Sequence, residues 1–165
     1  MTRLLVITYV LVFFLSACKP VENTMSNEGR VGDIGWINIE LGNKQRQSFI
    51  TTAKIIKTVE VNIRPSRKCD DTLTLNLLSE NNDILVTVLK DIPAGFYGWA
   101  LFEIPNSGLN TNPGTKMIIQ LEDSGALCFG WRYSMAKYPY GEAIFFGDSI
   151  QREYDFYFRI NYSIK

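Results

Sequence analysis

The sequence contains no histidine among its 165 residues. Ser-His-Asp and Cys-His catalytic systems both use an imidazole as the general base, so these classes of enzyme are excluded. Zinc and iron sites with histidine ligands are excluded for the same reason. Carboxylate chemistry, lysine chemistry or no catalysis at all remain.

An excess of charge of either sign is also missing. The chain carries 17 basic and 17 acidic side chains, and no run of like charges is longer than Arg67-Lys68 or Asp70-Asp71. Nucleic acids and anionic lipid surfaces attract proteins through a field of basic side chains, which this composition does not provide. We therefore expect no nucleic-acid partner.

Long apolar runs are rare, and the most extended one lies at the start of the chain. Residues 4–15 read LLVITYVLVFFL after the positive charge of Arg3, and small residues follow. This run is too short for a bilayer core of about 30 Å, which needs roughly 20 residues. A charged start, an apolar centre and small residues at the end are typical of a secretory signal, which we place at residues 1–17.

The residues that end this segment, Leu15-Ser16-Ala17-Cys18, resemble the bacterial lipobox. The resemblance implies a lipoprotein that is cleaved before Cys18, with a diacylglycerol on the thiol and a further acyl chain on the amine. Several chains hold a protein at a membrane where one is marginal, since each buried CH₂ contributes about 0.8 kcal/mol. The alternatives are an ordinary signal peptide cut nearby and an uncleaved anchor.

Lipidation places the expected location at the cell envelope. Lys19, and not aspartate, follows Cys18. In an organism with two membranes and the enterobacterial sorting rule, this resembles delivery to the outer membrane.

Cysteine is scarce, with three residues in all. Setting Cys18 aside leaves Cys69 and Cys128, an even pair in an exported chain, and such pairs form disulfides in oxidising compartments. The alternative is two separate buried thiols that behave as small apolar side chains. The sequence has no CxxC spacing, so we expect no zinc site on these cysteines.

Helical periodicity is missing, and alternation with a period of two takes its place. It is clearest at residues 55–63, 73–77, 129–133 and 154–162. Turn signals rich in Gly, Pro, Asn and Asp lie between the segments, among them Pro93-Ala-Gly95 and Asn112-Pro-Gly114. This pattern predicts an all-β fold, an antiparallel β-sandwich of about eight or nine strands over residues 34–165. The last strand, aromatic along one face, is expected to be central. The polar residues 18–33 are expected to form a flexible tether.

Several markers follow one another along the chain: Gln47-Ser-Phe49, Asp71–Leu75, Gly98-Trp99 with Phe102, Trp131, Tyr138–Ala143 and Tyr154–Phe158. Their order is similar to that of a jelly-roll β-sandwich, and it resembles carbohydrate-binding modules. The resemblance implies a non-catalytic binding or structural module, and no set of binding residues transfers with it.

Four aromatic residues are candidates for contact with a ligand, Trp131, Tyr133, Tyr138 and Tyr140. Sugar rings stack their C–H faces on flat aromatic side chains, and Trp and Tyr add a polar tip. Trp131 and Tyr133 are in register with Phe129, which favours the core for these two. Tyr138 and Tyr140 flank a proline in an expected loop, which either presents them to a ligand or packs a corner of the fold.

The adjacent carboxylates Asp70 and Asp71 are weak candidates for a calcium site, since calcium takes six to eight oxygen ligands. The alternative is a turn or strand cap, the usual role of such a pair before a strand. Glu103, Glu142 and Asp155 are the acids available for glycoside hydrolysis, which needs two carboxyl groups across a cleft. Scattered acids on a sandwich are normally solvated, so we expect no enzyme and no cofactor.

These observations favour a lipid-anchored, non-catalytic protein that binds a glycan at the cell envelope. The alternative is a structural or assembly lipoprotein that docks a protein partner.

Overall fold

The computed structural model describes residues 22–27, 34–42, 45–135, 138–145, 150–151 and 154–163. All regular elements in these ranges are strands, and the ranges contain no helix that is long and apolar enough to cross a membrane. The predicted signal segment and Cys18 lie outside the described residues, so the lipoprotein assignment stays a prediction.

Eight strands of the described part of the chain form one antiparallel sheet, which we call sheet A. Its strands are β1 (Glu22–Asn27), β2 (Ile34–Asn38), β4 (Ile55–Pro65), β7 (Gly98–Glu103), β8 (Leu109–Asn110), β10 (Phe129–Ser134), β13 (Asp155–Phe156) and β14 (Phe158–Ser163). The path runs β1-β14-β4-β10-β13, with β7 and β8 on the other edge of β4 and β2 beside β10.

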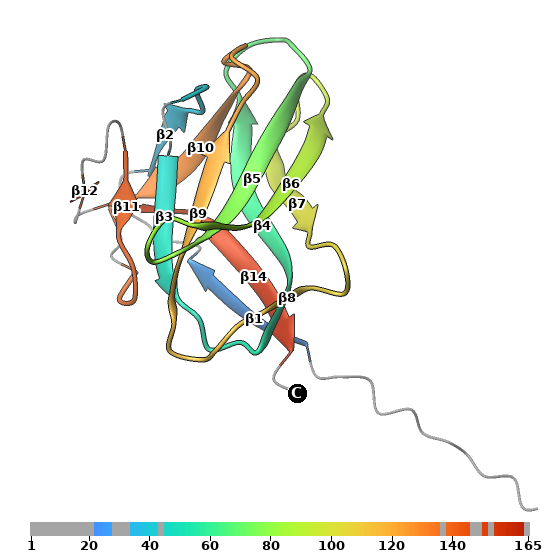
Figure 1. The fold of residues 1–165 in the computed structure, drawn as a ribbon. Coiled ribbons are helices and arrows are strands. Elements are labelled where there is room, and N and C mark those ends of the chain that lie inside the picture. The colour runs from blue at the N-terminus through green and yellow to red at the C-terminus, as the bar shows by residue number, and fades with distance from the viewer. Residues whose placement is uncertain are drawn as a thin grey trace, which may run out of the picture.

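The second sheet, sheet B, contains six described strands in the order β12-β11-β3-β9-β5-β6, and its pairs are also antiparallel. Its strands are β3 (Gln45–Ile50), β5 (Asp71–Ser79), β6 (Ile84–Ile92), β9 (Lys116–Glu122), β11 (Ala143–Ile144) and β12 (Ile150–Gln151). The two sheets enclose a common core and form a β-sandwich, as the alternation predicted (Figure 1).

The core follows from the alternation. Val59, Val61 and Ile63 of β4 are fully buried, and so are Leu73 and Leu75 of β5 in the other sheet. Burying a side chain of this size contributes about 1.5–3 kcal/mol relative to leaving it exposed. The outward rows of β4 and β5 contain mainly polar residues, such as Glu60, Thr72 and Thr74.

Strand β14 lies between β1 and β4, so the last long strand is interior, as predicted. Strand β1 differs from the expected tether over residues 18–33, because its six residues pair with β14 in unbroken register from Glu22↔Ser163 to Asn27↔Phe158. Pairing through main-chain N–H and C=O groups needs no apolar side chains, which is why the polar sequence ENTMSN did not indicate it. Thr24 also donates its hydroxyl to the Asn161 side chain at 2.8 Å.

Two turn signals of the sequence are confirmed. Gly95 and Gly114 have φ angles of +80° and +87°, a conformation that glycine adopts without steric cost. Main-chain bonds close both turns, from Phe96 to Pro93 and from Thr115 to Asn112, each at 3.1 Å.

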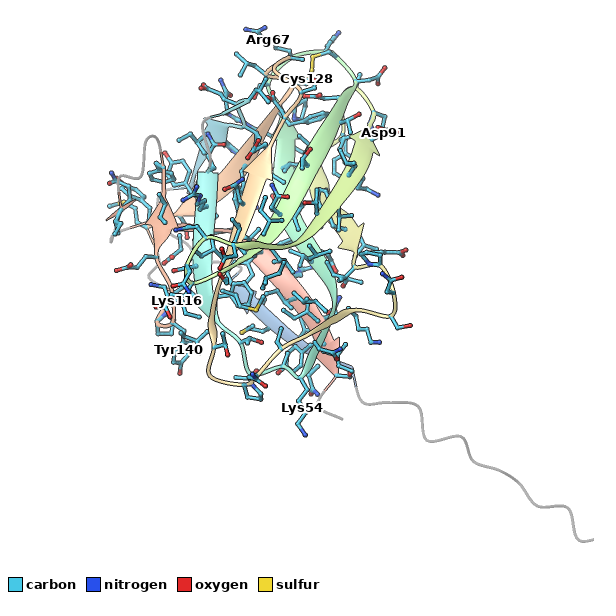
Figure 2. All side chains as sticks on the ribbon, viewed as in Figure 1. Lys54, Arg67, Asp91, Lys116, Cys128 and Tyr140 are labelled. Carbon is cyan, nitrogen blue, oxygen red and sulfur yellow. A yellow bond between two sulfur atoms is a disulfide. The ribbon has the colours of Figure 1, made fainter. Side chains whose placement is uncertain are left out.

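Cys69 and Cys128 form the predicted disulfide, with Cα atoms 5.6 Å apart and a sequence separation of 59. The bond joins the loop after β4 to the residue before β10. Cys128 lies at the end of the sandwich opposite Lys54 (Figure 2).

Replacing both cysteines by alanine is expected to lower the free energy of unfolding by about 4 kcal/mol, because the unfolded chain regains the freedom of the closed loop. Urea denaturation measures the change. Dithiothreitol should destabilise the parent protein to the same extent and leave the double variant unaffected. Equal stability of the two proteins would contradict the prediction.

Candidate functional site

The four aromatic candidates separate into two pairs. Trp131 is fully buried, stacks on Phe156 with ring centroids 4.2 Å apart, and donates its indole N–H to the Tyr157 carbonyl at 3.0 Å. Tyr133 is half-buried and packs edge-on against Phe145. Trp131 is thus a core residue with no surface to offer a ligand, which is the alternative that its register with Phe129 favoured.

Tyr133 has a specific reason for its position. It lies opposite Gly35 in the β10–β2 register, and a Cβ atom on Gly35 would meet the tyrosine ring at 2.2 Å. The ring therefore crosses over the glycine and lies in an aromatic cluster with Phe145, Tyr154 and Phe156.

Tyr138 and Tyr140 lie in a turn that is fastened to sheet B. The Ser48 hydroxyl accepts the Glu142 N–H at 2.8 Å, and the Ser48 N–H donates to the Glu142 carbonyl at 3.0 Å. A Cβ atom on Gly141 would come within 1.8 Å of the Ser48 carbonyl oxygen, so only glycine permits this close approach. The turn is thereby held in place relative to β3.

This turn forms one wall of a groove of about 450 Å³. We call it the tyrosine groove. Strand β1, the end of β14 and the residues around the end of β3 form the remaining walls. The lining residues are Thr24, Met25, Ser26, Ile50, Thr52, Tyr138, Tyr140 and Tyr162.

The three tyrosines of the groove differ in exposure. Tyr140 is 62% exposed, and its ring stands edge-on to that of Tyr138 with centroids 5.8 Å apart. Tyr138 is 8% exposed and packs on Phe158. The Tyr162 hydroxyl accepts a hydrogen bond from Thr52 at 3.1 Å. The groove thus contains both aromatic rings and hydroxyl groups.

The Tyr138 hydroxyl has no hydrogen-bond partner in the part of the chain that the structure describes. Burial raises the pKa of Tyr138 to about 12, with smaller contributions from Tyr140, Asp155 and Tyr162. The group is therefore protonated at neutral pH.

The buried carboxylate of Asp155 holds the turn that contains Tyr138 and Tyr140. Asp155 is 2% exposed, and its carboxylate accepts the Tyr138 N–H and, at 2.8 Å, the Gln47 side-chain N–H. Gln47 in turn accepts the Phe156 N–H at 2.8 Å. Burial raises the pKa of Asp155 to about 6 against the lowering effect of these two hydrogen bonds, and the charge of Glu142 raises it further.

The alternation of the last strand predicted Asp155 on the solvated face, and the structure buries it. The reason is a break in the strand: Asp155 pairs with β10, whereas residues from Phe158 onward pair with β4. Glu142 lies near Asp155, and Glu103 is exposed on β7. Asp155, the most buried of the three acids, thus holds the turn through its hydrogen bond to Tyr138.

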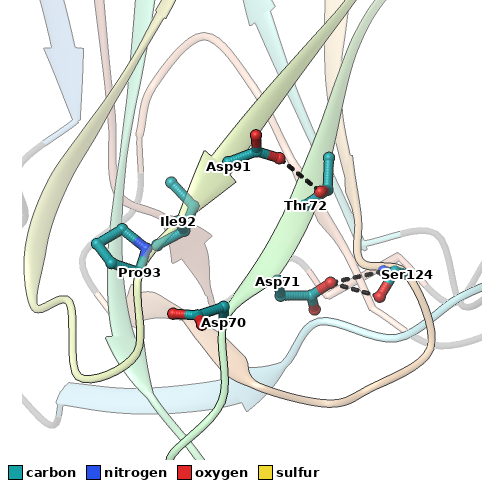
Figure 3. Close-up of a pocket in the computed structure, with 7 residues that line it drawn as sticks. All are labelled: Asp70, Asp71, Thr72, Asp91, Ile92, Pro93 and Ser124. Carbon is teal, nitrogen blue, oxygen red and sulfur yellow. Dashed lines mark hydrogen bonds between the residues drawn. The ribbon is translucent and has the colours of Figure 1, made fainter.

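Asp70 and Asp71 line a second hollow, of about 460 Å³ (Figure 3). Their carboxylates point in different directions, and each is already bonded: Asp70 accepts the Ala94 N–H at 2.7 Å, and Asp71 accepts the N–H and hydroxyl of Ser124. Asp91, on the far wall, accepts the Thr72 hydroxyl at 2.6 Å.

Hydrogen bonds of this kind are typical of a turn and a strand end. That role was the alternative to a calcium site for Asp70 and Asp71. Within the described residues, no group of three or more Asp, Glu, Cys or His side chains could hold a metal ion. The calcium assignment gains no support from this geometry.

Comparisons with known proteins do not add to this description. No family model matches the chain, and no curated protein matches it. The chemistry of the tyrosine groove must therefore be argued from its own residues.

Sequence reasoning found Tyr138 and Tyr140 and missed the rest of the groove. Tyr162 had a signal, since it ends the aromatic row of the last strand and a tyrosine there can reach the rim. Thr24, Ser26 and Thr52 had none, because they come together only through the pairing of β1 with β14.

The raised pKa of Asp155 predicts a pH dependence of stability. The folded chain binds a proton near pH 6 that the unfolded chain binds only near 3.8, so the free energy of unfolding should rise as the pH falls from 7 to 5. No histidine is present to titrate in this range.

Asp155→Asn should remove this rise, and it should lower stability at every pH because an amide offers one acceptor oxygen in place of two. Urea denaturation at pH 5, 6 and 7 measures both effects. A variant that kept the parent's pH dependence would show that another group carries it.

Proposed function

We propose that this chain is a non-catalytic lipoprotein of the bacterial cell envelope, anchored through Cys18, whose β-sandwich binds a glycan in the tyrosine groove. The observation that carries the proposal is Tyr140, whose ring is 62% exposed beside Tyr138 and Tyr162. Hydroxyl groups of Thr24, Ser26 and Thr52 line the same groove.

This combination suits a saccharide. The C–H faces of a sugar ring pack on an exposed aromatic plane, while its hydroxyl groups need donors and acceptors around that plane. Ligand pockets are largely apolar with a few fixed polar groups, and here Thr24, Ser26 and Thr52 supply the polar groups. The turn is fixed to β3, so little ordering is needed on binding.

Two features support an envelope location. The lipobox-like residues follow an apolar signal-like run, and the Cys69–Cys128 disulfide is typical of proteins that fold in an oxidising compartment. Strand β1 begins at Glu22, so the extended chain from a lipidated Cys18 reaches only about 14 Å. The groove, which β1 helps to form, would then face glycans close to the membrane surface.

Replacing Tyr140 by alanine is expected to weaken glycan binding about tenfold, the effect of losing roughly 1.4 kcal/mol of ring contact. The full-length protein in detergent would be tested on a glycan array and by pull-down with envelope, host and plant polysaccharides. Calorimetry would then measure the affinity for the glycans that bind.

Tyr140→Phe keeps the ring and should retain most of the affinity. Leu89→Ala, an exposed position on β6, serves as the control outside the groove. Binding to no glycan, or equal affinity of the parent and the Tyr140→Ala variant, would sink the proposal.

Docking of a protein partner is the second candidate, and strand β6 favours it. Within the described residues, β6 pairs only with β5, and Ile84, Leu85 and Leu89 are exposed on it by 61%, 46% and 67%. Free sheet edges with apolar side chains are templates for the addition of a strand. Crosslinking in membranes followed by mass spectrometry distinguishes the candidates, because one stoichiometric partner that is lost on changing Leu89 to Lys would favour docking.

A further inference from the structure

A second surface, on the outer face of sheet A, combines arginine and aromatic side chains. Trp36 of β2 lies directly opposite Arg132 of β10 in the register of these strands. Arg64 of β4 lies opposite Gly130, two residues earlier on β10. Because Trp131 and Ile63 face the core, Arg132 and Arg64 both project outward from the same sheet.

Both guanidinium groups lie against the same indole ring. The Arg64 Cζ atom is 4.9 Å from the Trp36 ring centroid, and the Arg132 Cζ atom is 5.5 Å from it. Arg132 also lies 4.7 Å from the ring centroid of Tyr157, which is buried beneath it. Tyr97, 67% exposed, has its ring centroid 5.9 Å from that of Trp36.

The two positive charges are not balanced within the described part of the chain. No described carboxylate forms an ion pair with Arg64 or Arg132, and Arg132 Nε is buried without a hydrogen-bond partner there. The neighbouring Arg159 differs, because Glu60 lies 3.7 Å from it. Two like charges lie on one ring in a chain with no net charge. They create a local positive potential, which attracts an anion.

A second buried polar group lies on the same outward row of β4. Asn62 stands between Glu60 and Arg64, is 5% exposed, and its side-chain oxygen has no partner among the described residues. Buried polar atoms without a partner are rare in folded proteins and call for an explanation such as a ligand. Here the two unsatisfied groups, the Arg132 Nε–H and the Asn62 side-chain oxygen, come from two paired strands of sheet A.

We propose that Arg64 and Arg132, held on Trp36, bind the carboxylate of an acidic saccharide. The planar guanidinium fork matches a carboxylate in two parallel hydrogen bonds. The exposed ring of Tyr97 stacks on the sugar ring.

The chemistry of the surroundings favours a saccharide over an acidic protein. The core of a protein interface needs apolar side chains that become buried. Here the exposed ring of Tyr97 lies against Trp36, and the groups beside it are the two guanidinium ions. The site is thus small, charged and aromatic.

The test uses the full-length protein in detergent and saccharides that carry uronic or sialic acid carboxylates, each paired with its carboxyl-reduced counterpart. Tryptophan fluorescence and calorimetry report binding. The parent should bind at least one acidic saccharide about tenfold or more tightly than its reduced form, since a charged hydrogen-bonded pair is lost on reduction. Arg64→Gln, at an exposed position, should remove this preference.

Arg67→Gln is the matched control, because Arg67 is exposed three residues away and makes no contact with the Trp36 ring. It should change the affinity less than about twofold, as surface charges outside a site do. Tyr140→Ala should also leave acidic binding unchanged, which separates this site from the tyrosine groove.

Four results would overturn the proposal. They are no binding of any carboxylated saccharide, equal binding of the reduced forms, equal losses in the Arg64→Gln and Arg67→Gln variants, and binding of poly-glutamate as tight as that of the saccharides. The last result would instead identify the surface as a dock for an acidic protein.

Discussion

Three hydrogen bonds meet at the main chain of Tyr157 and direct the path of the last two strands. The Tyr157 N–H donates to the Arg132 carbonyl at 2.9 Å, and its carbonyl accepts from the Asn62 N–H at 3.3 Å and from the Trp131 indole at 3.0 Å. The chain leaves β10 and joins β4 at this residue. A buried main-chain carbonyl needs a hydrogen-bond donor, and the Trp131 indole supplies one to Tyr157. The indole thus fixes the residue at which the chain changes its partner strand from β10 to β4.

Both candidate surfaces depend on this exchange of partners. It places Asp155 in the interior, where the carboxylate holds Tyr138. It also determines which way the side chains of β14 face, and so brings Tyr162 to the tyrosine groove. It also places the Tyr157 ring under Arg132 on the opposite side of sheet A. The hydrogen bond between Gln47 of β3 and Asp155 of β13 links the two sheets across the core, and such a polar bridge specifies one alignment of the layers.

The sequence predicts what depends on local patterns. Alternation indicated the strands and the sandwich, the turn signals at Gly95 and Gly114 marked real turns, and cysteine counting identified the disulfide. A strand break without Gly or Pro leaves no such pattern, so Asp155 was expected in solvent. The pairing of β1 depends on main-chain groups that are the same for every sequence.

The candidate sites were predicted only in part, for the same reason. Tyr138 and Tyr140 are neighbours in sequence and were found together. Trp36, Arg64 and Arg132 come from three strands, and nothing in the sequence near any of them indicates the other two. Their proximity is a property of strand order and register, which alternation alone does not fix.

The antiparallel pairing of β1 with β14 has a consequence for how the domain is oriented. Glu22 is paired with Ser163, so the beginning and the end of the described fold lie together, whereas the Cys69–Cys128 bridge closes the other end of the sandwich (Figure 2). In a chain anchored as proposed, the long axis would stand away from the membrane, with the bridged loops outermost. An epitope inserted at Ser66–Lys68 would then be displayed to the surroundings, and a domain fused after the last strand would be held at the lipid surface.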